Sequence, residues 1–370
     1  MIRALLLVAV LGGTAAAETK HAKLPEGMAL DVVDGSLLLR EGAGSYRIDM
    51  GILSITSVTV AARAVDLVLS TNRCEEVQRY HFTLDELHAR GANAVAYQQH
   101  VKHAYAAARP GFTHAVALDP AWPIAAYNLA SADVALHDDA GALAALAPHL
   151  AKDPLATYAQ IVMDPELRPL RGKPELAAIV APGTHARIAV PVAARVLGYS
   201  AAKDLLAVTR VEAGWGACVF VMDVELWNAS ARTLAATARV IEADDTDPMT
   251  CGALPKRSRA RVAERAARAA DLLEDLGVDA VPIEAGALTA EDDKTRVVFG
   301  GAKLGLVAKD ELAHVFRGNT ELASGPVLHR LEWGQYVAAA HAIVTGSIRP
   351  GREGCEGTDP TQTTIFALPR

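Results

Sequence analysis

The stretch Phe82-Thr83-Leu84-Asp85-Glu86-Leu87 marks the point at which a β-type sequence gives way to a helical one. Thr83 and Glu86 have the spacing of a capping box, in which a threonine side chain caps the first helical turn and a glutamate reaches back to the threonine amide. Before this point, two apolar runs flank Asp34-Gly35, a dipeptide typical of tight hairpin turns. We therefore expect a β module over residues 18–83 and helices from residue 84 onward.

Beyond this point the chain is rich in alanine and repeats itself. Asp119-Pro120 recurs as Asp153-Pro154, a spacing of 34 residues, and Phe112 recurs as Leu146 at the same spacing. A fixed period of this length is typical of stacked helical hairpins, which bury their apolar faces only against one another. The pattern predicts a helical region over residues 84–182.

Over about residues 89–180 this region resembles tetratricopeptide (TPR) repeats, with one repeat at about 89–122, a second at about 123–156 and a terminating segment after it. The resemblance implies close packing at the following positions: Val95, Ala96, Tyr105, Ala108, Phe112, Ala115, Leu129, Ala130, Ala142 and Leu146. Pro110 and Pro148 depart from the pattern, and we expect each of them to kink or shorten its helix.

The same resemblance implies a partner-binding groove, because the inner face of the first helices in TPR proteins holds a peptide or a partner helix. Carried over by position, this face comprises Arg90, Asn93, Tyr97, His100, Ile124, Tyr127, Ser131 and Val134. Exposed Tyr, Asn and Arg side chains suit partner binding, since they combine contact area with directional hydrogen bonds. The alternative is that the two repeats pack against the flanking β modules and the groove is filled internally.

Residues 183–370 predict a separate β-rich α+β domain, so the whole chain is expected to be an α+β multidomain protein. Strand-like stretches are expected at 205–211, 217–227, 233–241, 295–299, 304–316, 327–331, 336–348 and 363–368. Arg257–Leu276 predicts a helix that stops at Gly277. Four arginines, Arg257, Arg261, Arg265 and Arg268, share one stripe of it. We interpret this stripe as a solvated face balanced by nearby carboxylates; the alternative is a docking site for an acidic partner.

Residues 1–17 have a short basic start, an apolar run and an Ala15-Ala16-Ala17 end, which together predict a signal peptide cleaved after Ala17. The cleavage site lacks a cysteine for a lipid anchor, and no later apolar run is long enough to span a membrane. A periplasmic or secreted location is therefore expected. In that oxidising setting we favour a disulfide between Cys251 and Cys355, and leave the states of Cys74 and Cys218 open.

The charge balance and the missing motifs restrict the classes of function. The chain has 36 Lys and Arg against 43 Asp and Glu, a net charge of −7, which argues against a nucleic-acid binder. It contains no nucleophile elbow, phosphate-binding loop, dinucleotide fingerprint or zinc-protease motif. We therefore predict no catalytic residue, no metal and no cofactor. The acidic run Glu242, Asp244, Asp245 and Asp247 lacks calcium-loop spacing, and we interpret it as a solvated turn.

These observations favour an exported, non-enzymatic interaction protein that binds a protein or peptide through its helical repeats. The alternative is an enzyme, or a small-ligand or glycan-binding protein, with its site in residues 183–370. A glycan site would be lined by Trp215, Trp227 or Trp333. The sequence leaves the identity of the partner and the oligomeric state open.

Overall fold

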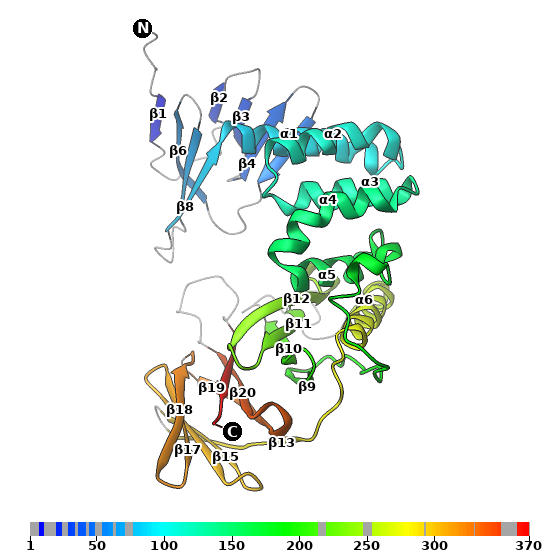
Figure 1. Ribbon diagram of the computed structural model, residues 1–370. Helices are drawn as coiled ribbons and strands as arrows, with labels where there is room; N and C mark the ends of the chain where they lie inside the picture. The colour runs from blue at the N-terminus through cyan, green and yellow to red at the C-terminus, as the bar shows by residue number, and fades with distance from the viewer. Residues whose placement is uncertain are drawn as a thin grey trace. The chain divides into compact units, whose positions relative to one another are not determined.

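The structure is a computed structural model that describes residues 7–10, 20–23, 29–33, 36–41, 44–48, 54–61, 64–70, 77–213, 220–246, 254–291, 294–328, 330–348 and 361–369. The chain divides into two compact units, Met1–Lys152 and Asp153–Arg370. The general α+β class is confirmed, since strands come first, helices follow, and further sheets complete the chain (Figure 1). The finer division at residues 83 and 182 stays a prediction.

The N-terminal unit begins with antiparallel strands. They are β1 (Leu7–Val10), β2 (Lys20–Lys23), β3 (Ala29–Val33), β4 (Ser36–Glu41), β5 (Gly44–Ile48), β6 (Ser54–Ala61), β7 (Ala64–Ser70) and β8 (Val77–Thr83). Among the described residues they form two sheets, with the orders β2-β3-β4-β5 and β1-β6-β7-β8. Val33 pairs with Ser36, which confirms the hairpin predicted around Asp34-Gly35. β1 falls within the predicted signal peptide, most of which lies outside the described residues.

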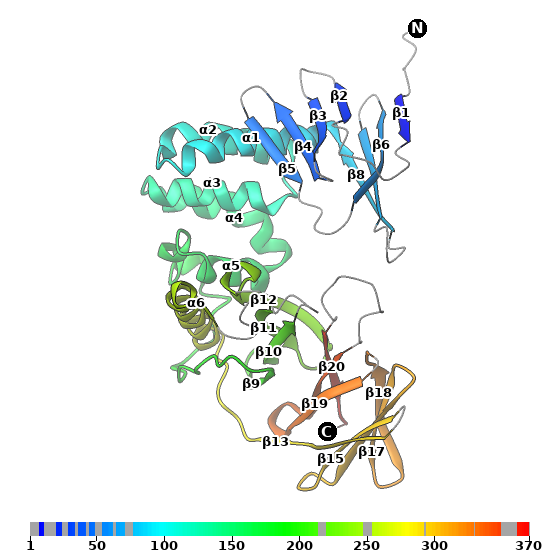
Figure 2. The same cartoon turned by 180° about the vertical axis from the view of Figure 1, so that it is seen from behind.

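Helices follow β8 without a break. They are α1 (Leu84–His100), α2 (Tyr105–Leu118), α3 (Pro123–Ala135) and α4 (Asp139–Lys152). The predicted capping box is present at the start of α1: the Glu86 amide donates to Thr83 Oγ1 over 3.2 Å, and the Thr83 amide donates to Glu86 Oε2 over 2.6 Å. Each helix packs on the next, and α1 also contacts β4 and β5 (Figure 2).

Small side chains let these helices approach closely. Ala96, Ala108, Phe112, Leu129 and Ala132 form one buried cluster. The positions expected to pack closely are buried, except that Tyr105 is half-buried and Val95 is 37% exposed. Pro110 and Pro148 lie inside α2 and α4, and neither helix ends there. The expected shortening therefore does not occur, because a proline removes only one backbone donor and the surrounding packing tolerates that loss.

The C-terminal unit opens with α5 (Pro154–Met163) and the short 3-10 turns η2 (Arg168–Leu170) and η3 (Pro174–Leu176). A sheet of order β12-β11-β10-β9 follows, built from β9 (Arg195–Ser200), β10 (Leu205–Ala213), β11 (Phe220–Asn228) and β12 (Thr233–Ile241). After the turn η4 (Ala243–Asp245), α6 (Lys256–Asp275) packs with α5 against β12. Gly277 follows α6 with φ +66°, as predicted for a helix stop.

The remaining strands form two further antiparallel sheets, with the orders β13-β19-β20-β21 and β14-β15-β16-β17-β18. The strands are β13 (Ile283–Ala285), β14 (Ala287–Glu291), β15 (Lys294–Phe299), β16 (Leu304–Lys309), β17 (Leu312–Arg317), β18 (Thr320–Pro326), β19 (Arg330–Val337), β20 (Ala342–Ile348) and β21 (Thr361–Ala367). The turn η5 (Ala338–Ala340) joins β19 to β20. The predicted strand 304–316 is instead a hairpin, because Asp310 and Glu311 adopt positive φ values of 52° and 62°.

The sheet containing β20 is buried on both faces. Ala342 and Val344 pack into a core shared with β9 and β10, whereas Ile343 packs into a core shared with β15, β16 and β17. Successive side chains of a strand point to opposite faces, so β20 carries an unbroken run of buried residues from Ala342 to Ser347. This central sheet therefore ties the two outer sheets of the unit together.

Candidate functional site

The predicted groove face of α1 and α3 is partly closed by its own side chains. Asn93, His100 and Ser131 are 5%, 5% and 4% exposed. Asn128 donates its side-chain N–H to Asn93 Oδ1 over 2.9 Å, which joins α3 to α1 across this face. The His100 ring packs edge-on to Tyr105 and Phe112. These three residues therefore form the base of the face and are not at its surface.

Arg90 is occupied within the N-terminal unit. Its guanidinium donates to the Glu86 carbonyl over 2.7 Å and to the Asp119 carboxylate over 3.2 Å. The same group lies 5.1 Å from the Phe82 ring centroid and 4.7 Å from that of Trp122. Arg90 therefore joins Phe82, at the end of β8, to Trp122, which precedes α3. The side chain is half-buried, and cation–π contacts strengthen as water is excluded.

Tyr97 and Ile124 are the predicted groove residues that reach the surface, each 48% exposed. Tyr97 stacks on His100 with the ring centroids 5.8 Å apart. Tyr127 is half-buried beside His149 of α4, at a centroid distance of 6.2 Å. Burial, and then the charge of Lys152, lowers the pKa of His149, so Tyr127 has an uncharged neighbour at neutral pH. The surface left on this face is thus aromatic and aliphatic.

The acidic turn and the arginine stripe balance each other, as interpreted from the sequence, but the solvated turn and solvated face expected there are wrong in part, since Asp245 and Arg268 are buried. Asp245 of η4 is 1% exposed, accepts from Arg261 over 2.8 Å, and contacts Arg265 as well. Its pKa is below the ordinary value: burial opposes this, but the Glu242 amide, Arg265 and Arg261 together outweigh the burial. Asp247 lies outside the described residues. The described part of the chain contains no cluster of three or more His, Cys, Asp or Glu side chains arranged to hold a metal.

Because the pKa of Asp245 is lowered, the free energy of unfolding is expected to fall as the pH falls. A carboxyl with a depressed pKa in the folded state stabilises it fully above the unfolded-state value, about 3.9, and loses this contribution as pH falls through the folded-state value. We expect Asp245→Asn to cost about 2 kcal/mol at pH 7. Urea denaturation of both proteins from pH 7 to pH 2.5 measures the difference. It should stay constant down to about pH 5 and shrink below about pH 4; a constant difference at every pH contradicts the assignment.

The cysteines and tryptophans named from the sequence do not form a site among the described residues. Cys74, Cys218, Cys251, Cys355 and Trp215 all lie outside the described residues. Trp227 and Trp333 are half-buried and pack against the core between two sheets, where Trp227 Nε1 donates to Glu225 over 2.9 Å. Their indoles therefore do not form an open platform for a sugar.

An ionic cluster that no sequence pattern indicates lies between α5, η2 and α6. Tyr158, fully buried on α5, donates to Asp275 over 2.7 Å, and Arg171 pairs with both oxygens of the same carboxylate. The carboxylate of Asp271 forms ion pairs with Arg168, Arg171 and Arg187. More than 80 residues of sequence separate each partner from its carboxylate, so no local spacing reveals the cluster.

No helix within the described residues has both the length and the apolar character needed to cross a membrane. Comparison of the chain with protein-family models, with curated proteins and with solved structures gives no match in any of the three.

Proposed function

We propose that the chain is an interaction protein that binds an apolar peptide segment of a partner along the shared face of α1 and α3, in the manner of a short TPR-like groove. The observation that carries the proposal is the exposure of Tyr97 and Ile124, 48% each, on two helices joined by the Asn93–Asn128 hydrogen bond. Exposed apolar side chains that gather on one rigid face are typical of partner-binding surfaces.

The chemistry of this face favours an uncharged partner segment. Its accessible side chains are Tyr97, Ile124, Tyr127 and Val134, none of which carries a charge, and the nearby cation of Arg90 is already paired with Asp119. Tyrosine supplies contact area and a hydroxyl for hydrogen bonding. The buried polar base keeps the two helices fixed, which reduces the entropy lost on binding.

Export is part of the proposal, and it rests on the sequence pattern of residues 1–17. The partner is accordingly expected among periplasmic or secreted proteins, and the Cys251–Cys355 disulfide stays a prediction for that oxidising compartment. The protein is therefore tested as its native host produces it. Mass spectrometry identifies its N-terminal residue, which is Glu18 if cleavage follows Ala17.

Crosslinking mass spectrometry compares wild type with the double variant Tyr97→Ala, Tyr127→Ala. We expect recovery of the bound partner to fall at least about tenfold in the double variant, since tyrosines at the centre of an interface contribute strongly to binding. Tyr80→Ala is the matched control, because Tyr80 is 39% exposed on β8 and lies outside the proposed face. A partner set that is unchanged in the double variant, or lost equally with Tyr80→Ala, contradicts the proposal.

A further inference from the structure

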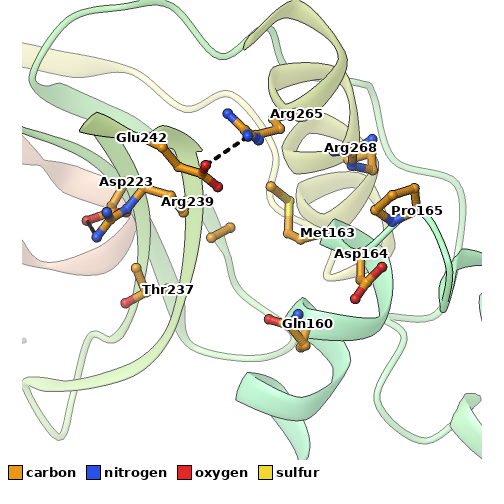
Figure 3. A pocket seen from close by; sticks show the side chains of 11 residues that line it. Gln160, Met163, Asp164, Pro165, Asp223, Thr237, Arg239, Glu242, Arg265 and Arg268 are labelled. Atoms are coloured by element: carbon orange, nitrogen blue, oxygen red, sulfur yellow. Dashed lines mark hydrogen bonds and ion pairs between the residues drawn. The ribbon is translucent and has the colours of Figure 1, made fainter. Parts of the chain in front are cut away.

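A cavity of about 700 Å³ lies in the C-terminal unit, between the end of α5, β12 and α6 (Figure 3). Its size falls within the range of about 300–1,000 Å³ that is typical of small-molecule sites. Its lining includes three carboxylates and three arginines, namely Asp164, Asp223, Glu242, Arg239, Arg265 and Arg268. Charged groups of both signs therefore face it, next to an apolar wall.

Two of the three arginines in the lining are neutralised within the fold. Arg239 donates to Asp223, a carboxylate only 1% exposed. Arg265 contacts Asp245 and lies 3.0 Å from Glu242, the pair marked in Figure 3. Asp223 and Glu242 are two of the three carboxylates in the lining. Most of the negative charge on the cavity wall is therefore already paired with guanidinium groups.

Arg268 differs from the other two. Its side chain is 7% exposed, and its one ion pair within the described residues is with Glu264 one turn earlier, over 2.6 Å. Glu264 is 63% exposed, so water screens this pair. Arg268 Nε is buried and has no hydrogen-bond partner in the part of the chain that the structure describes. A buried guanidinium donor of this kind is matched by an acceptor in nearly all folded proteins.

The surroundings of Arg268 also suit an anion. Asp164 lines the same cavity; burial raises the pKa of its carboxyl, and the charge of Arg268 acts against that rise. Met163, Pro165 and Ala238 supply apolar surface in the same cavity. The volume is several times that of a single inorganic phosphate, so an organic ligand fills it better.

We propose that this cavity binds a small organic anion, a carboxylate or a phosphate monoester, whose oxygens accept hydrogen bonds from the Arg268 guanidinium. The carbon skeleton of the ligand lies against Met163, Pro165 and Ala238. Carboxylate and phosphate share the oxyanion geometry that a guanidinium recognises. This site is independent of the α1–α3 face, so either proposal stands if the other fails.

Calorimetric titration and thermal-shift measurement on the full chain test the proposal. The probes are benzoate, hexanoate, phenyl phosphate and hexyl phosphate, each compared with the neutral alcohol of the same skeleton, benzyl alcohol or hexanol. We expect at least one anion to raise the melting temperature and its alcohol not to do so. Whether the carboxylate probes or the phosphate probes bind identifies the class of anion.

Arg268→Gln removes the buried guanidinium and is expected to weaken binding at least tenfold. Thr237→Trp, at an exposed strand position on the cavity wall, fills the cavity and is expected to abolish binding without altering any arginine. Arg257→Gln is the matched control, because Arg257 is exposed on the same helix and does not line the cavity. If Arg268→Gln does not fold, Thr237→Trp decides the test. Equal binding of anion and alcohol, binding by none of the anions, or full binding by Thr237→Trp overturns the proposal.

Discussion

Arg171→Met is expected to lower the free energy of unfolding of the C-terminal unit by about 3–5 kcal/mol, because it leaves the half-buried carboxylate of Asp275 without a cationic partner among the described residues and removes one of the three arginines that pair with buried Asp271. Arg171 donates from Nε over 2.7 Å and from Nη2 over 2.8 Å to the two oxygens of Asp275, and lies 3.3 Å from Asp271. The Asp271 and Asp275 side chains are 6% and 15% exposed. Methionine keeps the length of the side chain, so the change removes mainly charge and hydrogen bonds.

The neighbours of Arg171 cannot replace it. Burial, and then the hydrogen bond to Asp275, raises the pKa of Tyr158, so its hydroxyl stays a protonated donor and supplies one hydrogen bond but no charge. The hydrogen bonds that Arg171 donates to Asp275 raise the pKa of Arg171 as well, which keeps the guanidinium charged at every accessible pH. In the variant, Asp275 retains only the Tyr158 hydroxyl as a side-chain partner among the described residues of the cluster.

Urea denaturation of wild type and Arg171→Met at pH 7 measures the effect. The matched control is Arg187→Met, since Arg187 also pairs with Asp271, over 3.1 Å, but is 51% exposed. A half-exposed pair is worth about 1 kcal/mol or less. Equal and small losses in the two variants would show that the cluster does not hold α5 and η2 against α6.

Local spacing predicts those parts of this fold in which the partners are close in sequence. The capping box of Thr83 and Glu86, the hairpin around Asp34-Gly35 and the stop of α6 at Gly277 each depend on a few neighbouring residues. The helix of residues 84–100 follows from the same local rules. Asp310-Glu311 shows the limit of this approach, since glutamate rarely adopts the positive φ that both residues have where the chain turns.

The candidate sites follow less well from the sequence, because the burial of their residues depends on partners that are distant along the chain. Repeat spacing identified which residues of α1 and α3 share a face, but exposure on that face depends on what packs beside it. Asn93 is buried because Asn128, 35 residues later, bonds to it. Arg268 belongs to the predicted arginine stripe, yet its burial comes from elements more than 100 residues away in sequence, such as α5. No local pattern carries that information.

Phe112→Ala is the second large effect, with an expected loss of about 3–5 kcal/mol in the helical part of the N-terminal unit. Phe112 is fully buried, and apart from Leu129 the buried apolar residues in its cluster are alanines. Truncation of this ring, which packs against the alanines, Leu129 and the edge of the His100 ring, leaves a void. The cost depends on whether the surroundings can collapse into that void.

The close approach of α1 and α2 prevents such a collapse. A Cβ atom placed on Gly111 would lie only 2.8 Å from Ala96 Cβ, so the two helix backbones are already at their nearest distance beside Phe112. The loss should therefore lie at the upper end of the range, whereas Phe112→Leu, which keeps most of the volume, should cost about 1.5 kcal/mol or less. Urea denaturation measures both variants, and hydrogen exchange should show the lost protection over residues 84–152. If the alanine and leucine variants are equally stable, the ring does not fill this interface and the helices are held by their alanine contacts alone.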